Sequence, residues 1–296
     1  MAINYVDKYG KELDQKLVFG TYTNELETKN LLWMDAKTFK IQTITTTGLK
    51  PHTRNKGYNE GSVSNENKPY TITFDRDVEF FVDVMDQDET GQALTAANVT
   101  KEFNARHAGP EMDAYRFSKL ATKAAENGNS KDEEITKDNV FLTLKTAIRK
   151  VKKYGTQNLI MYVSPDVMFA LELCPDFTRS ITVQNIGPSS LETRITSIDG
   201  VRLVEVEAED RFYDTFDFTD GYKPVASAKK LNYLLVNKGS VIGGTKHASI
   251  YLHSPGAVGQ GDGWLYQYRV YHDIFVLEQQ KDGVIASTVA TTTSGE

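Results

Sequence analysis

The most regular hydrophobic pattern of the chain runs from Tyr70 to Val84, in the segment YTITFDRDVEFFVDV. Most even-numbered positions are apolar, and most odd-numbered positions are Thr, Asp or Glu. This period of two predicts a β-strand. Fifteen residues at about 3.3 Å each span roughly 50 Å, whereas ordinary strands have about five or six residues. We therefore expect this strand to project beyond one compact core.

The pattern changes after a short acidic turn, DQDET (86–90). From Leu94 the apolar residues recur at spacings of three and four, which predicts a long helix. Gly109-Pro110 interrupts it, and a proline inside a helix removes one backbone hydrogen bond. We expect a kink there, or a second helix that starts with Pro110 at its first position.

The outgoing partner of the long strand is expected just before it. Residues 40–47 (KIQTITTT) are rich in Ile and Thr, which favours strand. The 22 residues between, 48–69, carry four Asn, three Gly and two Pro, a composition typical of turns. The pattern predicts a long hairpin with a tip from Gly48 to Pro69, and a loop of this length in a compact domain is usually functional or ordered by a partner.

Tip and base of this hairpin carry opposite charge. The tip has four basic residues against Glu60 and Glu66, and the returning strand with its turn has seven acidic residues against Arg76 alone. We expect the basic tip to meet acidic residues of a neighbouring subunit. The candidates for subunit contacts are Lys50, Arg54, Lys56, Lys68, Asp75, Asp77, Glu79, Asp86, Asp88 and Glu89.

The middle of the chain predicts an α/β layer. The polar break ENGNSKDEE ends before Thr136, a predicted N-cap, which precedes a helix with Val140, Leu144, Ile148 and Val151 on one face and Gly155 at its end. NLIMYV (158–163) predicts a buried strand, and Ser164-Pro165 predicts the start of another helix.

From Arg179 onward the chain is rich in predicted strands. Asp199-Gly200 between apolar runs is a strong hairpin signal, and LNYLLVN predicts a buried strand. Residues 264–276 alternate as the first strand does, so we expect this second long strand to pair with the first. The tail STVATTTSGE (287–296) has no means of burying itself, so we expect it to be frayed or bound by a partner. A stripe of Tyr5, Tyr9, Leu13 and Leu17 predicts a short N-terminal helix.

Composition and charge narrow the function classes. The 296 residues have 34 Lys and Arg against 40 Asp and Glu, a net charge of −6, so the chain as a whole has no electrostatic signature of a nucleic-acid binder. We find no signal-peptide core and no apolar run near the ~18 residues of a membrane span. A single cysteine, Cys174, excludes an internal disulfide and a multi-Cys zinc site.

Three local patterns invite a chemical interpretation, and each has a simpler one. Residues 86–91 imitate the start of a calcium-binding EF-hand loop, but Ala97 stands where the bidentate Glu belongs; we interpret these carboxylates as helix-start and subunit-contact residues. The basic run 149–153 suits the last turns of a helix. His247 and His253 lack a third ligand.

The remaining patterns also lack functional partners. Gly243-Gly244 and Gly259–Gly263 lack the Lys-Ser/Thr of a phosphate loop and are interpreted as turns, and Cys174 as a small buried residue. The sequence thus predicts no catalytic residue, no cofactor site and no metal site.

Three local patterns together resemble the major capsid proteins of tailed bacteriophages, with the Hong Kong 97-type fold. They are FDRDVEFFVDVMDQDET, the following GPEMDAYRFSKLA, and the closing order of NYLLVNKGSVIG, a Gly-rich break and YRVYHDIFVLEQQKDGVIAS. The resemblance covers about Leu31 to Ser287. It implies an α+β fold with an N-terminal arm (1–35), an extended β-hairpin loop (36–85), a peripheral domain with a long spine helix (86–155), an axial α/β domain (156–258), and return strands with a C-terminal tail (259–296).

The resemblance also implies the function. It implies a non-enzymatic shell protein that assembles with itself into hexamers and pentamers of an icosahedral head, in the host cytoplasm and then in the virion. Some members have a long coiled-coil-like N-terminal scaffolding segment that this chain lacks, which implies a separate scaffolding protein or prior cleavage. The other implied partners are a portal and packaged double-stranded DNA by weak non-specific contact; no membrane is implied. An encapsulin-type nanocompartment is the alternative, and a soluble hydrolase or calcium-dependent binding domain a remote one.

Overall fold

The computed structural model describes residues 21–28, 31, 33–35, 37–52, 58–85, 103–174, 197–257 and 261–290. The expected N-terminal helix, the acidic turn 86–90 and the start of the long helix lie outside these residues. The strands are β1 Thr38–Thr46, β2 Val63–Thr71, β3 Phe74–Asp83, β4 Ser130–Glu133, β5 Leu159–Val163, β6 Ser197–Ile198, β7 Val201–Glu205, β8 Phe216–Asp217, β9 Lys223–Pro224, β10 Leu231–Asn237, β11 Val241–His253, β12 Gly263–Val276 and β13 Val284–Val289. The main helices are the short η1 Tyr22–Leu26, the π-helical turn η2 Asn104–Ala108, α4 Gly109–Glu126, α5 Val140–Val151 and α6 Pro165–Glu172; shorter helical turns are η3 Lys152–Tyr154, η4 Thr156–Asn158, η5 Glu209–Arg211, η6 Lys238–Ser240 and η7 Glu278–Gly283.

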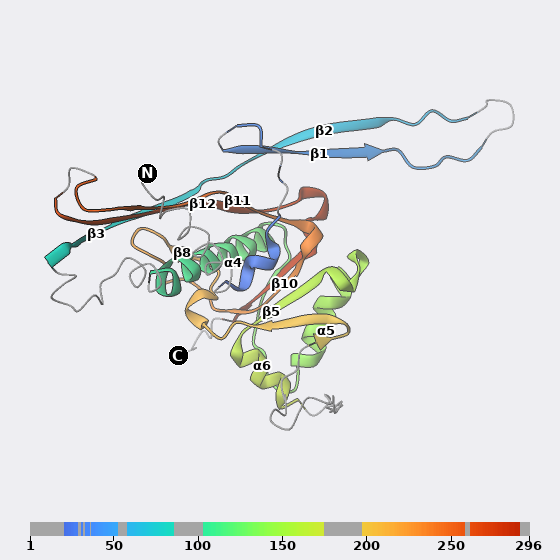
Figure 1. The fold of residues 1–296 in the computed structure, drawn as a ribbon. Coiled ribbons are helices and arrows are strands. Elements are labelled where there is room, and N and C mark those ends of the chain that lie inside the picture. The colour runs from blue at the N-terminus through green and yellow to red at the C-terminus, as the bar shows by residue number, and fades with distance from the viewer. Residues whose placement is uncertain are drawn as a thin grey trace, which may run out of the picture.

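A six-stranded sheet forms the centre of the described part of the chain, in the order β4-β13-β10-β5-β7-β6 (Figure 1). All seven residues of β10 are buried, because both faces of the sheet are covered. Phe117 and Leu120 of α4 pack with one face, and α5 and α6 pack with the other. This gives three layers, helix on sheet on helix, and confirms the predicted mixed α+β class.

A second sheet, in the order β11-β12-β3, lies across α4. β12 pairs antiparallel with β3 from Gly263↔Asp83 to His272↔Phe74, so the predicted pairing of the two long strands is confirmed. Tyr266, Tyr268 and Val270 face inward and join a small core beside the first turns of α4. Two cores thus meet along one helix.

The predicted 15-residue strand is divided. Its first part belongs to β2, which pairs with β1, and its second part is β3, which pairs with β12. Ile72 and Thr73, which we call the joint, connect the two sheets. The joint leaves the strand ladder because Ile72 is buried and its N–H donates to Lys37 O at 2.9 Å, while the Thr73 N–H donates to a carboxylate of β12.

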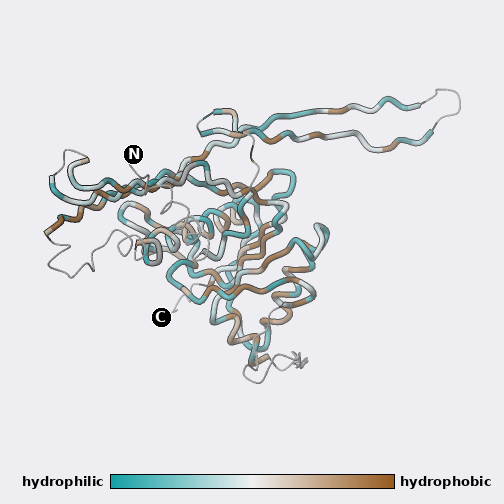
Figure 2. The backbone as a smooth tube through the Cα atoms, viewed as in Figure 1, coloured by the Kyte–Doolittle hydropathy of each residue, from teal (hydrophilic) through white to brown (hydrophobic). Residues whose placement is uncertain are grey.

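β1 and β2 form a hairpin that projects from one side of the body, while β3 continues from β2 toward the opposite side (Figure 1). The register runs from Thr38↔Thr71 to Thr46↔Val63. Strand β2 therefore begins six residues before the predicted end of the loop, Pro69, and the prediction that 63–69 is loop is wrong. These residues, SNENKP among them, have neither face buried, so no alternation marks them in the sequence (Figure 2).

Three other predictions of local structure are also wrong. The polar break contains β4, an edge strand that pairs in parallel with β13 and has no fully buried residue, so its polar residues are compatible with a strand. Helix α5 starts at Val140 after the N-cap position Asn139, and Asn139 Oδ1 accepts the Thr136 N–H at 2.8 Å, so Thr136 is not the N-cap. Gly243 and Gly244 lie within β11 and not in a turn.

The tail was also expected to be unburied, yet Ser287 and Thr288 are buried in β13. Ser287 Oγ donates to Glu133 Oε1 at 3.0 Å and Thr288 Oγ1 donates to Asp132. Polar hydroxyls are accommodated in the sheet because the carboxylates of β4 accept from them.

Several local predictions are confirmed. The stripe Val140, Leu144, Ile148 and Val151 of α5 is at most 1% exposed. The Ser164 side chain caps α6 by accepting the Val167 N–H. Asp199 and Gly200 both have positive φ, as the tight turn between β6 and β7 requires. Cys174 is buried. No helix in the described ranges has the length and hydrophobicity that crossing a membrane needs.

Candidate interaction surfaces

The root of the hairpin is packed, and its outer part is not. Phe39 is buried, and its ring lies 5.7 Å from Tyr70 and 5.5 Å from Phe275. Further out, Ile44 is 63% exposed and Val63 is 72% exposed. An isolated two-stranded hairpin is marginally stable in water, so the outer half of this hairpin lacks the packing that would hold it within one chain.

The basic tip candidates have separate surroundings. Lys50 Nζ donates to Glu60 O at 3.3 Å across the tip. Lys68 forms an ion pair with Glu278 at the root, and the hydrogen bond that Lys68 donates to that carboxylate raises the pKa of Lys68. Arg54 and Lys56 lie outside the described residues. Lys68 thus has a partner within its own chain.

The acidic candidates share one face of β3. Asp75, Asp77 and Glu79 are exposed on the outer face of the sheet, where Arg269 contacts Asp75 through two hydrogen bonds of 2.6 and 3.0 Å, and Gln267 donates to Glu79 at 2.6 Å. Asp86, Asp88 and Glu89 lie outside the described residues. The outer part of the β1–β2 hairpin and strand β3 extend to opposite sides of the body (Figure 1), so they do not meet within one chain.

A buried polar cluster at the joint was not predicted. Asp273 of β12 is fully buried and accepts from Thr73 N at 3.1 Å, Thr73 Oγ1 at 3.2 Å and Tyr115 Oη at 3.0 Å. Lys119 of α4 completes the cluster with an ion pair to the same carboxylate. Burial and the Asp273 charge raise the pKa of Tyr115. The Asp273 carboxylate thus connects the hairpin, β12 and α4.

Helix α4 binds the N-terminal segment through a second buried cluster. Asp113 is fully buried and accepts from Tyr22 N at 3.0 Å, Thr23 N at 3.1 Å and Thr23 Oγ1 at 2.8 Å. One turn along, Arg116 is 1% exposed and donates to Glu27 at 3.0 Å. Burial raises the pKa of the Asp113 carboxyl. The sequence signal for both clusters is the spacing of Asp113, Arg116 and Lys119, three charged residues at successive i+3 positions among the apolar residues of α4.

His272 is the buried break in the alternation of β12. It is 1% exposed, and its Nδ1 atom has no hydrogen-bond partner in the described structure. Its ring lies 5.1 Å from Phe74 and 5.5 Å from Tyr115. Burial, and then the nearby Arg116 and Lys119 charges, lower the pKa of His272 well below its usual 6.5. Within the described ranges, no group of three or more His, Cys, Asp or Glu residues could hold a metal ion; the side chain of His247 and the EF-hand-like segment lie outside the description.

Comparison with known proteins finds similarity in structure alone. No protein-family model and no curated protein matches the sequence. Among solved structures, a chain of the bacteriophage PhiM1 mature capsid matches with a TM-score of 0.63 at 12% identity, covering 93% of this chain and 88% of that one. The capsid structure of cyanophage P-SCSP1u matches with a TM-score of 0.60 at 10% identity, covering 92% and 89%. A virus-like particle from Pyrococcus furiosus matches with a TM-score of 0.53 at 8% identity, covering 96% and 100%.

These matches extend over nearly the whole chain on both sides. The chain therefore has the fold of tailed-phage capsid proteins. With identities of 8 to 12%, the similarity concerns the fold alone.

Proposed function

We propose that this chain is the major capsid protein of a tailed bacteriophage, and that copies of it assemble into an icosahedral head around double-stranded DNA. The observation that carries the proposal is the β1–β2 hairpin, whose outer half exposes Ile44 and Val63 and has no packing partner among the described residues. Burying such residues against a second copy stabilises both copies at about 25 cal/mol per Å² of apolar surface. The role is structural, with no substrate.

Within this proposal the basic tip of one copy contacts acidic residues of its neighbour. The supporting observation is that the outer part of the β1–β2 hairpin and the acidic strand β3 lie on opposite sides of the body (Figure 1), as contacts between successive copies require. The acidic turn 86–90 takes part in the same contacts. Weak non-specific contact with DNA, a portal, a separate scaffolding protein, assembly in the host cytoplasm and the five-part domain division belong to the same proposal.

Electron microscopy of the expressed protein tests the proposal. We expect closed shells, or rings of six and five subunits, with or without a co-expressed scaffolding protein. A monodisperse monomer of 33.2 kDa under all conditions, scaffold included, would contradict it.

Charge reversal tests the tip. The variant with Lys50→Glu, Arg54→Glu and Lys56→Glu should assemble poorly and with greater sensitivity to salt, because exposed ion pairs are screened within a Debye length of about 8 Å at physiological salt. Lys40→Glu, an exposed change near the root of the same hairpin, is the matched control. Normal particles from the triple variant would contradict the role of the basic tip in subunit contacts, but not the assembly of the chain into a shell.

An encapsulin-type compartment that holds cargo proteins is the second candidate. The similarity to the Pyrococcus furiosus virus-like particle, which covers that whole chain, favours it. Mass spectrometry of particles purified from the native source distinguishes the two: cargo enzymes indicate a compartment, and packaged DNA with tail proteins indicates a phage head.

A further inference from the structure

The outer face of the three-stranded sheet changes character along β3. At the end far from the joint, the register places Phe81 beside Leu265 of β12, and Leu265 beside His253 of β11. Two residues along β11, Tyr251 stacks on His253 with the ring centroids 6.4 Å apart. Phe81 is 45% exposed and Tyr251 is 49% exposed. These four residues, which we call the aromatic end, form a surface without Asp, Glu, Lys or Arg.

The two faces of the β1–β2 hairpin also differ. Ile44 pairs with Asn65, so Ile44 and Val63 are diagonal neighbours on one face. We call this the apolar face; along its outer part it carries only uncharged residues, which are Gln42, Ile44, Thr46, Val63, Asn65 and Asn67. The opposite face carries Glu66 and Lys68. Exposed apolar residues gathered on one face mark a surface for contact with another molecule.

The order of features along the hairpin matches the order along β3. Away from the joint, the hairpin presents Ile44 and, six residues further, Lys50. Toward the joint, β3 presents Phe81 and, six residues further, Asp75. Because the hairpin and β3 extend to opposite sides of the body (Figure 1), a second copy in the same orientation, placed beyond the hairpin, turns the Phe81 end of its β3 toward the first copy. Each interval spans roughly 20 Å at about 3.3 Å per residue, so Ile44 can lie on Phe81 while Lys50 reaches the carboxylates near Asp75.

We propose that the apolar face of the hairpin of one copy packs on the aromatic end of a second copy. There Ile44 and Val63 contact the exposed ring of Phe81, and each copy uses a different surface, as in a head-to-tail contact. The contact removes apolar surface of both copies from water and buries no charge. The charges beside it set the direction, because docking in the reverse direction would take Lys50 away from the carboxylates. The inference rests on the proposed shell function and names the two surfaces that meet.

Disulfide formation between copies tests the contact. Phe81→Cys and Ile44→Cys are combined in one chain, whose native Cys174 is buried, and the particles are oxidised and run on a non-reducing gel. A disulfide needs Cα atoms within about 7 Å, and the outer hairpin and β3 extend to opposite sides of the body, so each bond joins two copies. We expect ladders of linked chains. Thr43→Cys in place of Ile44→Cys puts the thiol on the opposite face and should give at least about tenfold less linked chain.

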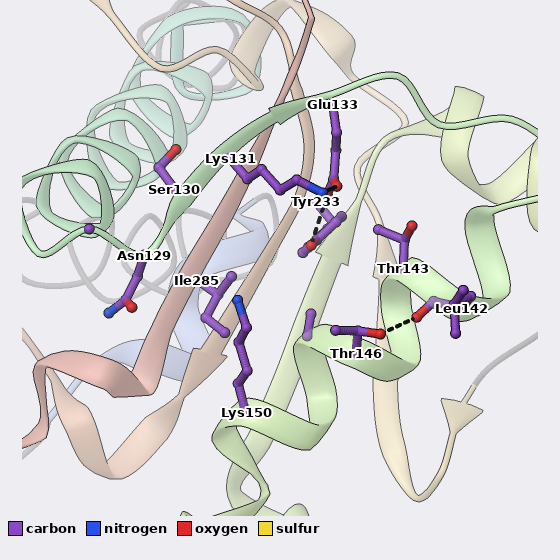
Figure 3. A pocket seen from close by; sticks show the side chains of 12 residues that line it. Asn129, Ser130, Lys131, Glu133, Leu142, Thr143, Thr146, Lys150, Tyr233 and Ile285 are labelled. Atoms are coloured by element: carbon purple, nitrogen blue, oxygen red, sulfur yellow. Dashed lines mark hydrogen bonds and ion pairs between the residues drawn. The ribbon is translucent and has the colours of Figure 1, made fainter.

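An exchange of charge tests the same pair without a disulfide. Ile44→Lys and Phe81→Glu alone should each lower the yield of particles, because each buries a charge without a partner. Together in one chain they should raise the yield at least about tenfold above either alone, because the two charges pair across the contact. Lys150→Gln is the control for the change of net charge, since Lys150 lines a groove between α5 and the six-stranded sheet (Figure 3), outside the proposed contact; it should leave the yield unchanged.

Linked chains from positions 44 and 81, together with rescue by the charge pair, would support the inference. Normal particles without such links, equal linking from Thr43→Cys, or no rescue would overturn it and leave the shell function standing. Absence of particles from the unmodified chain under all conditions would contradict the shell function, and this contact with it.

Discussion

At the scale of single residues, Asp273 holds the joint. Thr73, Tyr115 and Lys119 all reach this one buried carboxylate from other elements. Removing one partner of a buried ion pair leaves the other partly desolvated and unmatched. We expect Asp273→Ala to lower the free energy of unfolding by about 3 kcal/mol, as measured by urea denaturation of the unassembled chain.

The control for this change is Glu126→Ala, which removes the exposed ion pair with Lys123 and should cost about 0.5 kcal/mol or less. Asp273→Asn keeps an acceptor for Thr73 and should fall between the two. Equal stability of Asp273→Ala and Glu126→Ala would show that the cluster does not hold the joint.

His272 predicts a dependence of stability on pH. Its folded pKa lies well below 6.5, so below about pH 6.5 the unfolded chain binds a proton that the folded chain does not. The stability from neutral His272 is present above that pH and is lost as the pH falls. Lowering the pH from about 7.5 to about 5.5 should therefore lower the free energy of unfolding by about 1 kcal/mol through this residue.

His272→Phe tests this, because phenylalanine keeps a ring beside Phe74 and Tyr115 without a titrating atom. Urea denaturation at both pH values should show a pH-dependent loss smaller by that amount in the variant. An unchanged loss would mean that other groups control the stability in this range.

At the scale of elements, the N-terminal segment depends on a close approach to β11. Thr28 N donates to Gly243 O at 2.8 Å, and a Cβ atom at Gly243 would lie 2.8 Å from Leu26 O. Gly243→Ala should therefore lower the free energy of unfolding by about 1 to 3 kcal/mol and expose residues 21–28 to proteolysis. Gly48→Ala meets no atom within 4 Å and should change stability by less than about 0.5 kcal/mol; equal behaviour of the two variants would contradict the close contact.

Strands and helices with a buried face left a readable hydrophobic pattern in the sequence, and the exposed part of β2 did not. The alternation in β3 and the stripe of α5 are imposed by packing on one side, so each left a clear period. Residues Val63–Pro69 pair with β1 and are exposed to solvent on both faces, so their positions do not require apolar side chains. The partners of Asp273 and Asp113 lie about 90 to 200 positions away in the sequence, and spacing along one chain carries no information about such contacts.

At the scale of the whole molecule, the body and the hairpin should differ in stability. The seven residues of β10 lie in a sheet covered on both faces, whereas β1 and β2 pair only with each other. In the unassembled chain, amide hydrogens in the outer hairpin should exchange fast and those of β10 slowly. In assembled particles the hairpin amides should become protected, as hydrogen exchange with mass spectrometry can measure. Equal rates of amide hydrogen exchange in the hairpin of the unassembled chain and of the particles would show that the hairpin does not take part in subunit contacts.

The hairpin is attached to the body at the joint, so a change of angle at the joint moves the far end of the hairpin. Nine residues at about 3.3 Å reach roughly 30 Å, so a tilt of about 10° at Thr73 displaces the far end by about 5 Å. The angle of the hairpin depends on the hydrogen bond from Thr73 to Asp273 of β12. Tyr115 and Lys119 of α4 hold that carboxylate in place. A small change in the position of Thr73 would therefore become a much larger displacement at the far end of the hairpin, while the packing of the two cores stays as it is.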